Sequence, residues 1–300
     1  MRPKPFDRSE IRSLIAEAEQ MLSAGPHPER ARRDAETLLL HVLRREAPER
    51  NLAWLIAHDN SPTMPKAGVE FRALVQRRCA GEPIQYIMGE AEFYGLSFKV
   101  NSAVLIPRPE TEHLVEKVIE IAGGLKNQPI AELRVADVGT GSGAIAVALS
   151  SKLPAARIEA TEKSAAALKV ARANAEQNGV ANRVTFHEGD LLEPVAGEMF
   201  DFVVSNPPYV PEPDRVSLSI EVRDYEPAQA LFAGADGLDV YRRLIPAALA
   251  VLTQGGFVAL EIGFGQQDAV GKLLADARFE DIEFTKDLQG IARVAVARRP

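Results

Sequence analysis

The sequence of 300 residues has one cysteine, few histidines and no long uncharged apolar run, so it lacks the features that build disulfide frameworks, histidine metal centres or membrane spans. Its single cysteine, Cys79, cannot form an intrachain disulfide, which fits a reducing compartment. The five histidines do not cluster at metal-ligand spacing, so we expect no metal site. No window holds the roughly 18 uncharged apolar residues of a membrane helix, and the charged start "MRPKPFDRSEIRS" lacks an apolar signal core. We therefore expect a cytoplasmic protein with no membrane partner.

Positive charge is scarce in the larger, C-terminal part of the chain. The formal net charge is −7, and the acidic excess lies after residue 85. A protein that follows a nucleic-acid backbone over a long track needs a basic surface, so we expect no direct nucleic-acid partner. The hydrophobic share of 46% and the charged share of 26% are ordinary for a globular protein, and the length favours about two domains.

Residues 1–85 predict a bundle of four or five short helices. In "SEIRSLIAEAEQMLSAG" the apolar residues recur at helical spacing, and "PERARRDAETLLLHVLRRE" repeats that pattern. The residues that should form the buried face of the first helix are Ile11, Leu14, Ile15, Ala18 and Leu22. The segment has no catalytic constellation, so its expected role is packing or partner docking. We interpret it as a helical substrate-recognition domain.

The texture changes after residue 85. Residues 86–109 alternate aromatic and β-branched residues with Gly and Asn turns, which indicates a β-hairpin linker. Residues 110–300 begin with the helical pattern "ETEHLVEKVIEIAGG" and then alternate strands with helices from Leu133 to the end. This order predicts an α/β domain with a doubly wound, mostly parallel, seven-stranded sheet of Rossmann-like type. Ligands of such sheets bind at the carboxyl ends of the strands.

The first strand of this region ends in the glycine loop "DVGTGSG". Glycines let the backbone turn tightly and approach a ligand, and the helix N-terminus that follows favours polar or anionic groups. The loop also satisfies the loose dinucleotide fingerprint G-x-G-x-x-A. However, Asp137 at the strand tip suits a ligand ammonium group and would repel a pyrophosphate. The loop residues that we expect to bind the cofactor are Gly139, Thr140, Gly141, Ser142 and Gly143.

Two further acids follow the next two strands. Glu162 ends the second strand, where a carboxylate can accept hydrogen bonds from both hydroxyls of a ribose. Asp190 follows the third strand, where it can accept from an adenine amino group while Leu191 packs on the ring. The alternative interpretations, without a ligand, are that Glu162 is an acid on the surface and that Asp190 caps a turn or a helix. A ligand with an ammonium, a ribose and an adenine but no phosphate is S-adenosyl-L-methionine, whose product would be S-adenosyl-L-homocysteine.

The stretch "FDFVVSNPPYVPEP" predicts a buried strand that stops at its prolines, because proline cannot donate to a sheet ladder. The Asn206 side-chain carbonyl and the Pro207 backbone carbonyl can hold the two hydrogens of a planar NH₂ group. This favours a tetrahedral nitrogen and aims its lone pair at the sulfonium methyl, without a strong base. We expect Asn206 and Pro207 to be catalytic, and Pro208 and the ring of Tyr209 to complete the substrate site.

Four segments together resemble the release factor glutamine methyltransferase family (PrmC/HemK) of class I S-adenosylmethionine-dependent methyltransferases. They are "GEPIQYIMGEAEFYGLSFKV", "LIPRPETEHLVE", "DVGTGSGAIAVAL" and "VVSNPPYVP". The resemblance covers nearly the whole chain. It implies methylation of the side-chain nitrogen (N5) of the glutamine in the Gly-Gly-Gln motif of class I peptide chain release factors. It also implies that Gly139 to Gly143, Glu162, Leu191 and Asn206 contact the cofactor, and that Asn206 to Tyr209 hold the glutamine.

The sequence departs from the family pattern at two of these positions. Glu162 stands where the family more often has Asp, and Leu191 where some members have an aromatic residue that stacks on adenine.

Three other functions stay open. They are a DNA or RNA methyltransferase acting on adenine N6 or guanine N2, a non-enzymatic factor-binding module, and a nicotinamide oxidoreductase. We expect the protein to act as a monomer.

Overall fold

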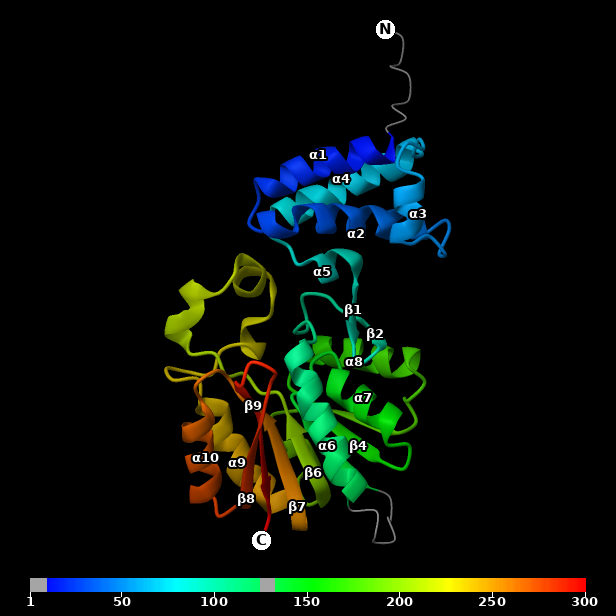
Figure 1. Ribbon diagram of the computed structural model, residues 1–300. Helices are drawn as coiled ribbons and strands as arrows, with labels where there is room; N and C mark the ends of the chain where they lie inside the picture. The colour runs from blue at the N-terminus through cyan, green and yellow to red at the C-terminus, as the bar shows by residue number, and fades with distance from the viewer. Residues whose placement is uncertain (1–9, 125–132) are drawn as a thin grey trace. The chain divides into compact units, whose positions relative to one another are not determined.

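The computed structural model describes residues 10–124 and 133–300, which form two compact units (Figure 1). The helical unit comprises residues up to Gly89 together with Ser219–Tyr225. The sheet unit comprises Glu90–Leu218 and Glu226–Pro300. This division places the expected hairpin in the sheet unit, and the domain boundaries expected at residues 85 and 109 stay predictions.

The described residues of the helical unit form five short α-helices, in agreement with the helical pattern of the sequence. Its elements are α1 (Ile11–Ser23), α2 (Ala31–Arg44), α3 (Leu52–Ala57), α4 (Pro65–Cys79) and α5 (Ile84–Met88). All five apolar residues expected on the inner face of α1 are buried. They pack with Leu38, Leu39, Phe71 and Val75 of α2 and α4 in one core. Nowhere in the described parts of the chain is a helix long and apolar enough to cross a membrane.

The short segment Ser219–Tyr225 is held in the helical unit by a buried arginine. Arg78 is 2% exposed, and its Nε donates to Asp34 Oδ2 at 2.6 Å. Its Nη1 donates to Glu221, and Tyr225 donates to the carbonyl of Ala80 at 3.0 Å. A buried guanidinium needs its charge partners, so this segment is part of the unit's polar core. The sequence pattern does not predict that these residues, far along the chain, belong to the helical unit.

The sheet unit begins with the antiparallel hairpin of β1 (Glu90–Phe93) and β2 (Leu96–Lys99), which the sequence predicted. A fully buried asparagine of α8, Asn174, fastens this hairpin. Its Oδ1 accepts from the Lys99 amide at 2.7 Å, and its Nδ2 donates to the carbonyls of Lys99 and Ser142 at 3.0 and 2.8 Å. One side chain thus joins the hairpin to the glycine loop.

The main sheet has seven strands in the order β5-β4-β3-β6-β7-β9-β8. Strand β9 pairs antiparallel with both β7 and β8, whereas β3 to β7 are mutually parallel. This confirms the predicted mostly parallel, doubly wound sheet. The strands are β3 (Arg134–Val138), β4 (Arg157–Glu162), β5 (Val184–Glu188), β6 (Phe200–Ser205), β7 (Leu252–Glu261), β8 (Glu280–Lys286) and β9 (Ala292–Arg298).

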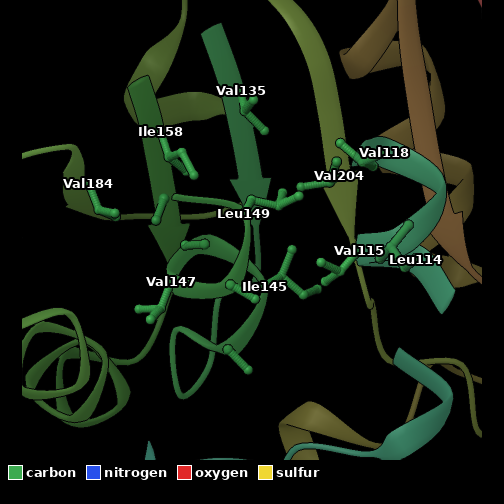
Figure 2. Packing of buried hydrophobic residues seen from close by; sticks show 14 of the residues in the cluster. Leu114, Val115, Val118, Val135, Ile145, Val147, Leu149, Ile158, Val184 and Val204 are labelled. Carbon is green, nitrogen blue, oxygen red and sulfur yellow. The ribbon is translucent and has the colours of Figure 1, made fainter. Parts of the chain in front are cut away.

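Helices cover both faces of the sheet, and Figure 1 shows α9 and α10 on the opposite side from α6 and α7. Side chains alternate along the strands, so Val135 and Val204 pack under α6 and α7 (Figure 2), while Val203 faces α9. The helices are α6 (Glu112–Gly124), α7 (Ala144–Lys152), α8 (Ala165–Gln177), α9 (Asp239–Val251) and α10 (Gln267–Asp276). Helix α10 and the short helical turns between residues 212 and 230 are absent from the elements expected from the sequence.

Candidate active site

A cavity of about 380 Å³ lies at the carboxyl ends of the parallel strands. It brings together most of the residues that the sequence singled out. Those that line it are Gly139, Thr140, Gly141, Ser142, Glu162, Asp190, Leu191, Asn206, Pro207 and Pro208. Asp137, Gly143 and Tyr209 are not among the lining residues. In the part of the chain that the structure describes, no three His, Cys, Asp or Glu side chains form a group able to hold a metal ion.

The glycine loop turns on three left-handed residues. Gly139, Gly141 and Gly143 have φ angles of 71°, 56° and 82°. A Cβ at Gly143 would lie 3.2 Å from the backbone of Ala171, so a side chain there would push α8 away. A Cβ built at Gly139 would have no other atom within 4 Å apart from its chain neighbours, and Gly139 lines the cavity. Its backbone is therefore accessible from the cavity. The loop can therefore receive a ligand at close range.

Asp137 lies behind the loop and supports it. Its side chain is fully buried, and its Oδ2 accepts from the Thr140 hydroxyl at 2.6 Å and from the Ala146 amide at 3.2 Å. Burial raises the pKa of Asp137 to about 7, against the opposing effect of these two hydrogen bonds. Its Oδ1 has no partner among the described residues. The expected contact of Asp137 with a ligand ammonium group stays a prediction.

Glu162 closes the opposite side of the loop. Its Oε2 accepts from the Gly141 amide at 3.0 Å, and its Oε1 accepts from the Ser164 amide at 2.9 Å. A carboxylate has about four lone-pair sites, so two remain for a ligand in the cavity. The two backbone bonds fix where those remaining sites point, and a ribose would meet an acceptor that is already oriented.

Asp190 and Leu191 line the end of the cavity beyond β5. Asp190 forms an ion pair with Arg243 of α9 at 2.5 Å, a partner that the sequence pattern did not reveal. Leu191 adopts a φ of 49°, which is uncommon for a residue with a side chain. Such a conformation persists only where the surrounding structure requires it. It places the Leu191 side chain at the cavity wall.

Asn206 follows β6 directly, at the centre of the sheet. Its Nδ2 donates to the Thr111 hydroxyl at 3.0 Å. Within the described residues its Oδ1 accepts no hydrogen bond, and neither does the carbonyl of Pro207. Both oxygens belong to residues that line the cavity. The structure therefore leaves these two oxygens without a partner among the described residues, and their expected contact with a substrate NH₂ group stays a prediction.

A buried carboxyl that the sequence analysis missed lies beside this tetrapeptide. Glu261, the last residue of β7, is 2% exposed. Its Oε2 accepts from the Thr111 hydroxyl at 2.6 Å, and its Oε1 accepts from the Tyr209 hydroxyl at 3.3 Å. Burial raises the pKa of Glu261 to about 7. The pKa of Tyr209 is also raised, mainly by burial and to a lesser degree by the nearby charge of Glu261. The residue pattern "FVALEIG" gives no sign of this role, because an acid at a strand end is usually exposed.

A second ion pair lies at the rim. Arg108 donates to Glu226 at 2.5 Å, and the Glu226 side chain is almost fully buried. Arg108 and Thr111 both line the cavity and come from the "PRPET" stretch before α6. The sequence analysis singled out this stretch for its family resemblance but identified neither the Arg108–Glu226 ion pair nor the hydrogen bond of Thr111.

Comparisons with known proteins agree with these features. Residues 13–89 match the model of the PrmC N-terminal domain, and residues 121–222 match the methyltransferase small domain. The release factor glutamine methyltransferase of Xylella fastidiosa (strain 9a5c) is 43% identical over 267 residues, 89% of this chain and 93% of its own. That of Moorella thermoacetica is 42% identical over 290 residues, 96% and 98% of the two chains. The solved catalytic domain of hMettl16 shares the fold, with a TM-score of 0.54 and 17% identity over 83% of this chain and 86% of its own.

The sheet order with one antiparallel strand, the glycine loop after β3 and the Asn-Pro-Pro-Tyr turn after β6 define a class I methyltransferase. Membership of a particular family follows from the relatives, which match this chain over about nine tenths of its length. The chain belongs to the release factor glutamine methyltransferase family.

The raised pKa of Glu261 predicts a pH dependence of stability. In the folded protein this carboxyl titrates near 7, compared with an ordinary value of 4.5. The folded state therefore holds the proton more tightly, and the free energy of unfolding should fall as the pH rises from about 4.5 to about 7 and then level off. Glu261→Gln cannot titrate, so its pH profile should lack about 3 kcal/mol of this fall.

Urea unfolding of the wild-type protein and the variant at several pH values between those limits measures the difference. Asp137→Asn should show a similar change in its pH profile, because Asp137 is also buried with a pKa raised to about 7. Parallel profiles for the wild-type protein and Glu261→Gln would contradict the prediction.

Proposed function

We propose that this protein transfers a methyl group from S-adenosyl-L-methionine to the side-chain amide nitrogen (N5) of the glutamine in the Gly-Gly-Gln motif of class I peptide chain release factors. The observation that carries the proposal is the placement of Asn206. Its amide lies in one cavity with the glycine loop, and its Oδ1 is left without a partner in the described structure. The relatives of this chain in Xylella fastidiosa and Moorella thermoacetica are named release factor glutamine methyltransferases, which supports the proposal.

The cavity fits S-adenosyl-L-methionine. The bare backbone at Gly139, the free lone pairs of Glu162 and the apolar wall at Leu191 suit its amino acid part, its ribose and its adenine in turn. Bound there, S-adenosyl-L-methionine supplies an electrophilic methyl group on a sulfonium. One oxygen of Asp190 is engaged by Arg243, so its second oxygen is the one that we assign to the adenine amino group.

Asn206 and Pro207 hold and activate the substrate nitrogen. An amide nitrogen is a weak nucleophile because its lone pair is delocalised into the carbonyl group. The Asn206 Oδ1 and the Pro207 carbonyl each accept one N–H of the substrate amide, which favours a tetrahedral nitrogen. Both oxygens are fixed by the strand end and the proline ring before the substrate arrives, so little reorganisation is needed during the reaction. Tyr209 is not among the lining residues, but Glu261 holds it directly after Pro208, which is one of them, and we assign its ring to the planar amide.

The methyl transfer needs no strong base. A bond forms between the glutamine nitrogen and the methyl carbon as the bond from that carbon to sulfur breaks. The electron pair of the broken bond stays on sulfur, which gives S-adenosyl-L-homocysteine. The methylated nitrogen is positively charged and acidic, so it releases one proton to water and becomes N5-methylglutamine.

The helical unit is the part that we assign to docking of the release factor. Several apolar side chains on its surface are exposed, including Ile56 at 66% and Val69 at 69%. These residues are suited to a protein partner more than to a nucleic-acid backbone. We expect the protein to act as a monomer and without nucleic acid.

Mass spectrometry tests the proposed function. The protein is incubated with S-adenosyl-L-methionine and either a class I release factor, the same factor with its motif glutamine replaced by alanine, or duplex DNA and RNA. We expect one added methyl group on the glutamine of the motif and none on the alanine variant. Methylation confined to adenine or guanine would overturn the proposal in favour of a nucleic-acid methyltransferase.

Asn206→Ala should lower the turnover number by a factor of roughly 10²–10³, because it removes the acceptor of a substrate hydrogen bond that becomes stronger in the transition state. The fold should persist, since the side chain's one hydrogen bond in the structure is to Thr111. Asn182→Ala, on an exposed turn, is the matched control and should turn over like the wild-type protein. Wild-type turnover by Asn206→Ala would contradict the role that we give to Asn206.

Glu162→Ala should weaken binding of S-adenosyl-L-methionine by about 1.5–3 kcal/mol, because hydrogen bonds to a charged acceptor are lost. Part of the effect comes from the Gly141 amide, which loses its partner in the loop. Isothermal titration calorimetry measures the change in Kd. Glu188→Ala, at the end of the neighbouring strand and exposed, is the control. An unchanged Kd for Glu162→Ala would remove Glu162 from the cofactor site.

A further inference from the structure

A chain of hydrogen bonds runs from the buried Glu261 to the side chain of Asn206. Leu260 of β7 pairs with Ser205 of β6, so Glu261 and Asn206 stand at the ends of two neighbouring parallel strands. Thr111, 4% exposed, lies between them. It donates to Glu261 Oε2 at 2.6 Å and accepts from Asn206 Nδ2 at 3.0 Å. The three residues come from three different segments of the chain.

The direction of these bonds decides which end of the Asn206 amide faces the cavity. A hydroxyl group has one hydrogen, and that of Thr111 is used by Glu261. Toward Asn206, Thr111 can therefore offer only lone pairs. The Asn206 NH₂ must face Thr111, and Oδ1 must point the other way. A reversed amide would set Oδ1 against an oxygen with no hydrogen between them, and it would offer donors where the substrate also has donors.

Glu261 can perform this role in both of its protonation states. A neutral carboxyl carries one proton, and placing it on Oε1 leaves Oε2 free to accept from Thr111. The Oε1 atom lies 3.3 Å from the Tyr209 hydroxyl, which can accept as well as donate. The same carboxyl thus holds both ends of the Asn206-to-Tyr209 turn, and burial keeps water from competing for Thr111.

We propose that Thr111 and Glu261 are positioning residues that set the orientation of the Asn206 amide, so that its oxygen and not its NH₂ meets the substrate nitrogen. The proposal rests on the proposed function, in which Asn206 Oδ1 accepts an N–H of the substrate glutamine. Neither residue needs to touch the substrate for this effect. Glu261 orders the Thr111 hydroxyl, and the hydroxyl orders the amide.

Thr111→Val and Thr111→Ser form the matched pair that tests it. Valine keeps the shape of threonine but has no hydroxyl, whereas serine keeps the hydroxyl and loses a methyl group. We expect Thr111→Val to lower kcat by about 10–100-fold, as is usual for groups that orient a catalytic residue. The Kd for S-adenosyl-L-methionine should change less than about 3-fold. Thr111→Ser should recover most of the lost kcat, which a purely structural role for the methyl group would not allow.

The double variant Thr111→Val/Asn206→Ala separates positioning from other roles. If Thr111 acts through Asn206, adding Thr111→Val to Asn206→Ala should cost no further activity. An additive loss in the double variant would overturn the proposal, because Thr111 would then act directly on a ligand or on the fold. Equal kcat for Thr111→Val and the wild-type protein would overturn it as well.

Glu261→Gln supplies a second, independent measurement. Its amide can present either its oxygen or its NH₂ to Thr111, so the hydroxyl is no longer forced to donate. We expect a loss of kcat that is smaller than that of Thr111→Val. Because Glu261 also holds Tyr209, the test compares this loss in two backgrounds: it should be smaller in the Thr111→Val background than in the wild-type protein. An equal loss in both backgrounds would overturn the role of Glu261 through Thr111.

Failure of this proposal is distinguishable from failure of the proposed function. If Asn206→Ala itself keeps wild-type turnover, the role of Asn206 is wrong and the proposed mechanism falls. If Asn206→Ala loses activity but Thr111→Val does not, or if the two losses add, the proposed function stands and only the positioning role falls.

Discussion

The parallel pairing of β3 with β6 is the constraint on which the site depends. The two strands are far apart in sequence, yet Asp137 pairs with Val204 and Val135 with Phe202 at the centre of the sheet. Ser205 adds a hydrogen bond from its hydroxyl to the carbonyl of Val138 at 2.7 Å. Because both strands run in the same direction, the glycine loop and the Asn-Pro-Pro-Tyr turn leave the sheet at the same edge. A shift of one residue in this register would point Asn206 away from the cavity.

Two buried carboxyls keep the loops at that edge in place. Asp137 supports the glycine loop through Thr140 and the start of α7, and Glu261 supports the turn after β6 through Thr111 and Tyr209. Burial raises the pKa of each to about 7, so the protein keeps two groups that are costly to ionise. A buried carboxyl of this kind costs stability when one of its oxygens has no partner, as Asp137 Oδ1 does among the described residues. Such groups are found where a site needs its side chains held in a fixed geometry. The methyl transfer needs such geometry, because its catalysis depends on positioning.

Much of the fold follows from local patterns. The helical spacing of Ile11, Leu14 and Ile15 gives the buried face of α1, and the short apolar runs of the second half give buried parallel strands. The glycine loop and the proline-ended strand were recognisable because glycine and proline restrict the backbone in ways that sequence alone reveals. The sequence pattern does not predict helix α10, because the apolar pattern there is short and contains Gly271. The return of Ser219–Tyr225 to the helical unit depends on Arg78, whose partners are distant in sequence.

The sequence by itself determined the class of chemistry, because the residues of that chemistry stand in two contiguous stretches with fixed local geometry. It also determined most of the order of strands and helices through periodicity, although not helix α10. Only the tertiary structure decided which carboxyls face the cavity and which support it from behind. Asp137 and Glu162 look alike in sequence, yet one is sealed by Thr140 and the other lines the cavity. Burial and hydrogen-bond direction are properties of neighbours brought together by folding, so neither Glu261 nor its link to Asn206 can be read from the chain alone.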